Sequence, residues 1–362
     1  MPGCPSLNRN FLPSTAFLVE PSPRVAGFSA LDYNPPMSWD LLGHEWAETL
    51  LRSHIARDDA RHAYLFTGAP GVGRRSLALE FASALNCIQP PEPGGYCGVC
   101  RICKLTWRIQ LPDLSLVTPE SEGGMIKVGQ VRELQRALTL TPYEARYRVA
   151  LLLNFQLANA NAQNALLKTL EEAPPSVILL LTADSADSLL PTISSRCEIL
   201  RLRPVPVETL EDALVKRWNI APEDARLYAH LASGRPGLAR QMAADPSMQE
   251  KRRGWVDEFL RLLPLNRRER FAAAENLARN REQLRLMLQV WLSFGRDLLL
   301  MNYGVENKLV NLDYEQDCRR IAAGLSSQRA LKVVNTLIKG LEDLEANANL
   351  RLLLDNILLD IP

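Results

Sequence analysis

A glycine-rich loop follows the apolar run HAYLF and carries the residue types that most directly suggest chemistry. The segment TGAPGVGRRS spaces Gly68, Gly71 and Gly73 like a phosphate-binding loop of the form G-x-x-x-x-G-K-[ST]. Arg74 stands where such a loop has its lysine, and Arg75 stands where it has the hydroxyl that holds Mg²⁺. Arginine replaces a compact ammonium by a wide planar fork. The sequence therefore favours a degenerate loop that preserves the fold.

A later apolar strand gives a second, independent test of nucleotide chemistry. Enzymes with such loops depend on acidic residues at the end of a later strand for Mg²⁺ and the attacking water. The corresponding run here is RVALLL at 148–153, and no carboxylate occurs between Arg148 and Lys168. Two motifs have thus lost their catalytic groups together. We expect no intrinsic ATPase activity and no bound ATP.

Four of the seven cysteines lie close together in the sequence, which favours a metal site over a disulfide framework. They supply soft thiolates on a Gly/Pro-rich loop, and four such ligands suit structural Zn²⁺. An iron–sulfur cluster is an alternative, because C-x₂-C-x₂-C also occurs in ferredoxins. Four unliganded thiols are the other alternative. The candidate metal ligands are Cys87, Cys97, Cys100 and Cys103.

The elements that must position these residues alternate between apolar strands and helices. Strands buried on both faces and alternating with helices indicate a parallel sheet covered on both sides. An amphipathic helix at 38–58 precedes them, and beyond Pro204 the sequence is helical throughout. Strands are predicted at 63–67, 114–117, 148–153, 176–182 and 198–204, and helices at 76–86, 130–140, 160–173 and near 187–190.

The same pattern predicts four segments. The first, 1–36, is rich in Pro and Ser without apolar periodicity and is expected to be disordered. An α/β domain spans 37–204 with the metal module at 87–103, and a small helical segment spans 205–245. A longer helical segment spans 246–362, with the boundary placed at Pro246.

Composition excludes some classes of protein. The chain has 362 residues, 47% of them apolar and 23% charged, as in ordinary soluble proteins. A formal net charge of +1 gives no bulk attraction to nucleic acid or membranes. No apolar run approaches the roughly 20 residues that span a bilayer, and no signal peptide is recognisable. The sequence predicts a cytoplasmic protein.

The segment NALLKTLEEAP at 164–174 closely resembles the NALLKTLEEPP signature of bacterial DNA polymerase III clamp-loader subunits, the γ/τ and delta prime subunits. The surrounding order is similar too: HAYLFTG before the loop, cysteines after the next helix, Ser195-Arg196-Cys197 after a strand, and NANLRLLLDNILL near the end. The resemblance covers about Trp39 to Pro362. It implies an AAA+ α/β module with a zinc module, a small helical lid at 205–245, and a helical oligomerisation domain at 246–362, the collar, that assembles five subunits into a ring.

Departures from the family pattern indicate its delta prime branch. Aligned on NALLKTLEE, Leu153 takes the place of the family's strand-end Asp, and Asn154 takes the place of its Glu. In this family γ/τ hydrolyses ATP and delta prime generally does not. The resemblance therefore implies a non-hydrolysing scaffold within the DNA-directed DNA polymerase holoenzyme.

The tripeptide Ser195-Arg196-Cys197 is the candidate catalytic element. The resemblance implies that Arg196 reaches into the ATP site of a neighbouring subunit as an arginine finger, where a planar cation stabilises the transferring phosphoryl group. A solvated or ion-paired arginine is the alternative. The implied partners are the γ/τ and delta subunits in a hetero-pentameric ring and, through the ring, the sliding clamp and primer–template DNA.

Two other functions are compatible with the sequence. The chain could be a divergent γ/τ-like subunit that binds and hydrolyses ATP through Arg74. It could also be a stand-alone zinc-dependent DNA-binding protein, against which the near-zero net charge argues.

Several further residues are assigned structural roles. Thr182 is expected to be a strand-end hydroxyl bonded to the backbone, and Gly234-Arg235-Pro236-Gly237 a turn between helices. Cys197 is expected to pack as a small buried residue, and Cys4 and Cys318 have no evident partner.

Overall fold

The computed structural model describes residues 39–121, 124–278 and 280–361. These residues form two units. One unit holds the residues up to Leu210 together with Gly234–Leu238, and the other holds Glu211–Ser233 and the residues from Ala239 onward. The tail predicted at 1–36 and Cys4 lie outside the described residues. The predicted limits of the lid and of the oligomerisation domain stay predictions.

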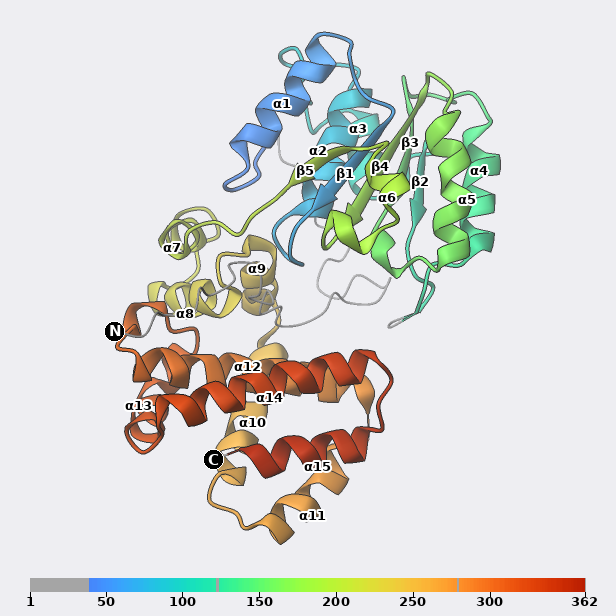
Figure 1. The fold of residues 1–362 in the computed structure, drawn as a ribbon. Coiled ribbons are helices and arrows are strands. Elements are labelled where there is room, and N and C mark those ends of the chain that lie inside the picture. Colours follow the sequence, from blue (N-terminus) through green and yellow to red (C-terminus); the bar gives the residue numbers. More distant parts are fainter. Residues whose placement is uncertain (1–38, 122–123, 279, 362) are drawn as a thin grey trace, which may run out of the picture. The chain divides into compact units, whose positions relative to one another are not determined.

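A five-stranded parallel sheet forms the first unit (Figure 1). Its order is β2-β3-β4-β1-β5, so the chain crosses over between non-neighbouring strands, and the register pairs Leu65 with Leu181 and with Ile199. Parallel strands need such crossovers, and helices supply them. The strands are β1 (Ala63–Thr67), β2 (Leu114–Val117), β3 (Arg148–Leu152), β4 (Val177–Ala183) and β5 (Glu198–Arg201).

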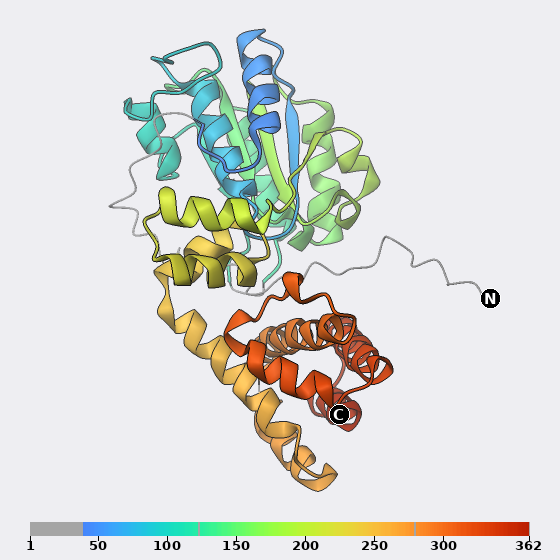
Figure 2. The ribbon, with the colours of Figure 1, turned by 90° about the vertical axis from the view of Figure 1, so that its left-hand side faces the viewer.

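Helices cover both faces of this sheet. Figure 2 shows the blue and cyan helices on one side of the strands and the green helices on the other. The helices are α1 (Glu45–Ala56), α2 (Arg74–Asn86), α3 (Arg101–Trp107), α4 (Val128–Leu138), α5 (Ala160–Glu171) and α6 (Pro191–Ser194), with 3₁₀ turns η1 (Phe155–Leu157) and η2 (Ala186–Ser188).

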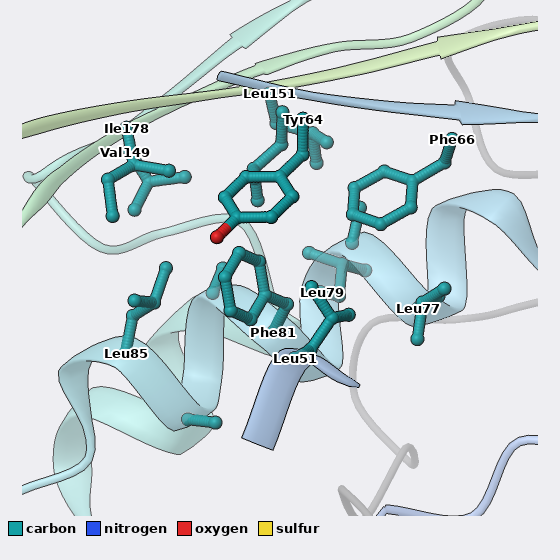
Figure 3. Packing of buried hydrophobic residues seen from close by; sticks show 14 of the residues in the cluster. Leu51, Tyr64, Phe66, Leu77, Leu79, Phe81, Leu85, Val149, Leu151 and Ile178 are labelled. Carbon is teal, nitrogen blue, oxygen red and sulfur yellow. The ribbon is translucent and has the colours of Figure 1, made fainter. Parts of the chain in front are cut away.

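Two apolar cores result, because successive strand side chains point to opposite faces. Tyr64 and Phe66 face α1 and α2, where Phe81 packs edge-on against Tyr64 (Figure 3). Leu65 lies in the core on the other face, with the apolar residues of α4 and α5. Apolar residues on both faces explain why these strands read as continuous apolar runs.

A buried carboxylate fixes the loop that leads into β3. Asp113 accepts hydrogen bonds from the backbone N–H groups of Tyr143, Glu144 and Ala145 and pairs with Arg148 at 3.1 Å. Burial raises the pKa of Asp113, but these N–H donors and the guanidinium outweigh it and hold the pKa below its usual value. The network therefore fixes the start of β3, and the residues that follow the end of β3 belong to the candidate site.

The second unit is helical. Its helices are α8 (Pro222–Ala232), α10 (Pro246–Leu262), α11 (Arg267–Leu277), α12 (Arg281–Asn302), α13 (Glu315–Ala323), α14 (Ser327–Glu345) and α15 (Leu350–Asp360), with 3₁₀ turns η3 (Glu306–Lys308) and η4 (Leu312–Tyr314). Helices α7 (Val207–Lys216) and α9 (Pro236–Ala244) each begin in the first unit and end in the second.

Polar contacts tie the long helices of the second unit together. The carboxylate of Asp297 on α12 accepts hydrogen bonds from the backbone N–H groups of Val310 and Asn311. Arg252 on α10 donates to Asn311 and to both oxygens of Asp313. The segment 310–313 is thereby held to two helices at once.

The predicted fold class is confirmed, and the five strands and helices α2, α4 and α5 lie where the sequence placed them, with small shifts at their ends. The short helix predicted near 187–190 is instead the 3₁₀ turn η2, and α6 begins only at Pro191, where a proline suits the first turn of a helix. The helix predicted at 38–58 begins only at Glu45. Gly43, with φ +79°, stops it, and a Cβ there would lie 2.1 Å from a methyl of Val205. Helix α3 was not predicted.

Candidate functional site

The glycine loop joins β1 to α2 in the predicted strand–loop–helix context. Gly68 and Gly71 both have positive φ. A Cβ on Gly68 would lie 2.4 Å from the carbonyl oxygen of Leu202, and one on Gly71 would lie 3.0 Å from the Leu238 backbone. Gly73 is the left-handed N-cap of α2. The protein's own packing therefore requires glycine in this loop, whether or not a ligand binds.

Arg74, the residue in the lysine position, points into the protein. Its side chain is only 4% exposed, and its guanidinium donates to Asp184 Oδ1 at 2.8 Å and to Asn154 Oδ1 at 3.2 Å. Arg75, in the position of the metal-binding hydroxyl, is exposed. An internal cation is thus tied to the ends of β3 and β4.

The end of β3 has no acid to offer a metal. Leu153 is buried in the core beside α2. Asn154 adopts the left-handed conformation with φ 52°, which asparagine tolerates better than most residues. Its backbone N–H donates to the Thr182 hydroxyl at 2.8 Å, which confirms the strand-end role predicted for that residue.

The segment Gly234–Leu238 closes against the loop within the same unit. The N–H of Gly237 donates to the Gly71 carbonyl at 2.8 Å, and the Val205 N–H donates to the Gly234 carbonyl. A turn joins α8 to α9, but it is shorter than the one predicted at 234–237, because Pro236 and Gly237 already belong to the first turn of α9. Arg235 in this turn is buried, and burial lowers its pKa to about 10. A second backbone segment is therefore in direct contact with the glycine loop.

Arg196 lies just after α6, on the surface. Its guanidinium pairs with Glu171 of α5 at 2.6 Å and donates to the Thr192 carbonyl at 2.9 Å. Ser195, the C-cap of α6, donates its hydroxyl to the same carbonyl. Cys197 is half-buried against the core beneath α5, in agreement with its predicted packing role. Arg196 is separate from the Arg74 network and exposed to solvent.

The four candidate metal ligands converge. The sulfurs of Cys87, Cys97, Cys100 and Cys103 all lie within 4.8 Å of one another. Cys87 is the C-cap of α2 and Cys100 is the N-cap of α3, so two helix ends carry the cluster. Cys103 is buried in the core, where Tyr96 and Ile102 also lie.

This geometry fits a tetrahedral metal ion. Zn–S bonds of about 2.3 Å place the sulfurs of a tetrahedral site about 3.8 Å apart. Backbone N–H groups of Cys97, Cys100 and Cys103 donate to the preceding cysteine sulfurs at 3.3–3.4 Å. Burial raises the pKa of Cys97, but hydrogen bonds from Cys100 and Val99 outweigh it and lower the pKa to about 7. The cluster can hold a metal ion such as zinc.

Sequence reasoning missed two residues of these arrangements. Asp184 was not singled out, although it directly follows the β4 strand at the edge where such sites form. Glu171 belongs to the NALLKTLEE signature, but its partner Arg196 is in another motif. No local spacing rule connects either residue to its partner.

The sheet order with a glycine loop after its first strand defines the class of fold as an AAA+-like α/β module followed by helices. Residues 43–206 match the family described as DNA polymerase III, delta subunit, and residues 248–362 match the family described as DNA polymerase III, delta subunit, C terminal.

Curated relatives agree with these matches. The chain is 34% identical over 221 residues to the DNA polymerase III subunit delta′ of Pseudomonas aeruginosa, covering 61% of this chain and 67% of the relative. It is 28% identical over 315 residues to that of Bacillus subtilis, covering 86% of this chain and 93% of the relative. The chain belongs to the family of DNA polymerase III delta′ subunits.

The chain is also similar to proteins described as tau and gamma-related subunits. The DNA polymerase III subunit tau of Escherichia coli is 32% identical over 210 residues, covering 57% of this chain and 32% of tau. A crystal structure of a gamma subunit-related protein from Thermotoga maritima matches with a TM-score of 0.44 and 21% identity, covering 86% of this chain and 97% of that one.

Among residues 39–121, 124–278 and 280–361, no helix combines the length and apolar character needed to cross a bilayer.

Proposed function

We propose that this chain is the non-hydrolysing delta′ subunit of a clamp loader, a scaffold in the hetero-pentameric ring that places the sliding clamp on primed DNA. The observation that carries the proposal is the Arg74 network. A guanidinium paired with Asp184 and Asn154 ties the position of the phosphate-binding lysine to the ends of β3 and β4, where a nucleotide site needs its acids.

The network bears directly on hydrolysis. A bound nucleotide needs a cation that reaches outward to its phosphates and a ligand for Mg²⁺. Arg74 instead donates to acceptors within the protein, and Leu153, at the position of a strand-end acid, is buried in the core. Both changes favour a scaffold over the alternative of a divergent γ/τ-like ATPase.

The catalytic contribution is assigned to Arg196 acting in trans. The residue is exposed on the surface of the α/β unit, where a neighbouring subunit can be reached without unfolding a core. A planar guanidinium carries its charge at any physiological pH and can bind phosphate oxygens with two N–H groups. Arg196 would therefore stabilise charge on the phosphoryl group transferred in the γ/τ site.

The remaining parts have structural roles in this proposal. Zn²⁺ held by the four thiolates would fix the segment between α2 and α3 against the core. Residues 246–362 would form the collar that assembles with γ/τ and delta, and residues 205–245 would form the lid. Contact with clamp and primer–template DNA would come through the ring.

The test is reconstitution with γ/τ and delta subunits. A stoichiometric complex should form, and Arg196→Ala should lower its ATP turnover while leaving assembly intact. Arg57→Ala, which removes an exposed arginine at the end of α1, is the matched control. The isolated chain should show no Mg²⁺-dependent ATP binding. Micromolar ATP affinity would instead support the γ/τ-like alternative, and failure to assemble would refute the scaffold role.

A further inference from the structure

Glu171, near the acidic end of the NALLKTLEE signature, has no role in the proposed function. In the structure it meets the Ser195-Arg196-Cys197 motif. Glu171 Oε1 lies 2.6 Å from Arg196 Nη2, and Arg196 Nη1 donates to the Thr192 carbonyl at 2.9 Å. Both ends of the guanidinium therefore have an acceptor within the same chain.

Helix α5 also holds the backbone that carries Arg196. Gln163 on α5 accepts a hydrogen bond from the Leu190 N–H at 2.9 Å and donates to the Ala158 carbonyl at 3.1 Å. Ile193 of α6 is fully buried in the core beneath α5. The backbone before Arg196 is thus anchored, and the long side chain is the part that is free to change partner.

The pair is weak enough to exchange. The side chains of Arg196 and Glu171 are 37% and 50% exposed. An ion pair this exposed is screened by water and typically changes an equilibrium by a factor of about 1.5 to 5. A phosphate group carries more negative charge than one carboxylate and offers more acceptor oxygens. Phosphate can therefore displace Glu171 from the guanidinium.

We propose that Glu171 is a positioning residue that holds the Arg196 guanidinium when no phosphate is presented and releases it to the nucleotide of the neighbouring subunit. The inference rests on the proposed role of Arg196 in trans. Glu171 competes with phosphate for the same cation, so it sets how readily Arg196 engages.

The pair is tested first in the isolated full-length chain. Phenylglyoxal modification of Arg196, followed by peptide mass spectrometry, should be about 1.5- to 5-fold faster in Glu171→Gln than in the unchanged chain. Glu172→Gln removes the same charge at the next position, which is also exposed, and should leave the rate unchanged. Glu171→Asp should restore part of the protection.

The competition is tested in the reconstituted complex. Glu171→Gln should lower the KM for ATP of the Arg196-dependent turnover by about 1.5- to 5-fold with little change in kcat, because a competitor of phosphate is lost. In an Arg196→Ala background the same substitution should have no effect. A residue that only stabilised the fold would not move KM in this background-dependent way.

The outcomes separate the two ideas. Unchanged turnover in Arg196→Ala defeats the proposed function, and this inference falls with it. If Arg196→Ala lowers turnover but Glu171→Gln matches Glu172→Gln in both modification rate and KM, only the inference is overturned.

Discussion

Arg74 and Asp184 form an ion pair of 2.8 Å that joins the first residue of α2 to the residue after β4. The two residues are 110 positions apart, and Arg74 is the more buried of them. A cation that phosphate-binding loops use for their ligand is here a link within the protein. The link is a property of the fold that can be measured without any partner subunit.

Asp184→Asn should reduce the free energy of unfolding by about 1–3 kcal/mol, because it leaves the buried Arg74 guanidinium with a weaker acceptor. The half-exposed position of Asp184 keeps the cost below that of a fully buried pair. Urea unfolding measures the change. Asp187→Asn, an exposed neutralisation three residues later, is the control, and equal costs for the two variants would contradict the link.

Glu80 should make stability depend on pH. Burial raises its pKa to about 8, despite a hydrogen bond from the Asp40 N–H that opposes the shift. The unfolded chain ionises this carboxyl near its ordinary pKa of 4.5, so the folded form binds the extra proton between these values. Its contribution is complete at low pH and is lost as the pH rises from about 4.5 through about 8.

Glu80→Gln should remove this slope, which is at most about 1.4 kcal/mol per pH unit. Urea unfolding at several values between pH 5 and pH 9 gives the comparison. Glu133→Gln on the exposed face of α4 should retain the slope of the unchanged protein. A slope that persists in Glu80→Gln would assign the pH dependence to another group.

Asp113→Asn should be among the most destabilising single substitutions, at about 3–5 kcal/mol. It removes the charge that three backbone N–H groups and the buried Arg148 share. Because the pKa of Asp113 is lowered, its contribution is present above pH 3.8 and is lost as the pH falls below that value. Chemical denaturation at pH 7 tests the cost, with exposed Asp59→Asn as the control; a loss under about 1 kcal/mol would be incompatible with this network.

The cysteine cluster should retain a single Zn²⁺ per chain, measured by elemental analysis of the purified protein. Removing the metal should lower the melting temperature, because Cys103 and Tyr96 of the metal module are part of the core. Cys100→Ser should lose zinc on dialysis, whereas Cys197→Ser, which lies outside the cluster, should not. Iron, or no metal, would refute the assignment.

The α/β part of the fold was predictable because its strands are apolar on both faces, as Tyr64 and Leu65 show by entering opposite cores. Helix α3 was not, because it is short and Cys100 caps it inside a cysteine motif. The late start of α1 depends on the contact of Gly43 with Val205, which no local pattern in the sequence contains.

Part of the candidate site was also predictable. The replacement of the lysine by Arg74 and of a strand-end acid by Asn154 could be predicted, because motif spacing defines both positions. The partners of the two arginines were not predictable. Asp184 reaches Arg74, and Glu171 reaches Arg196, only because the fold brings strand ends and neighbouring helices together.

The contacts of Gly68 and Gly71 affect how glycine-rich loops with this spacing should be interpreted in other protein sequences. A Cβ on Gly68 would clash with Leu202, and a Cβ on Gly71 would crowd Leu238 and strain a backbone of positive φ. A saturation mutagenesis scan would therefore find both positions intolerant even if selection for ligand binding had ended long ago. Glycine spacing of this kind can be explained by packing alone, so the residue types beside the glycines, such as Arg74, are the better guide to nucleotide chemistry.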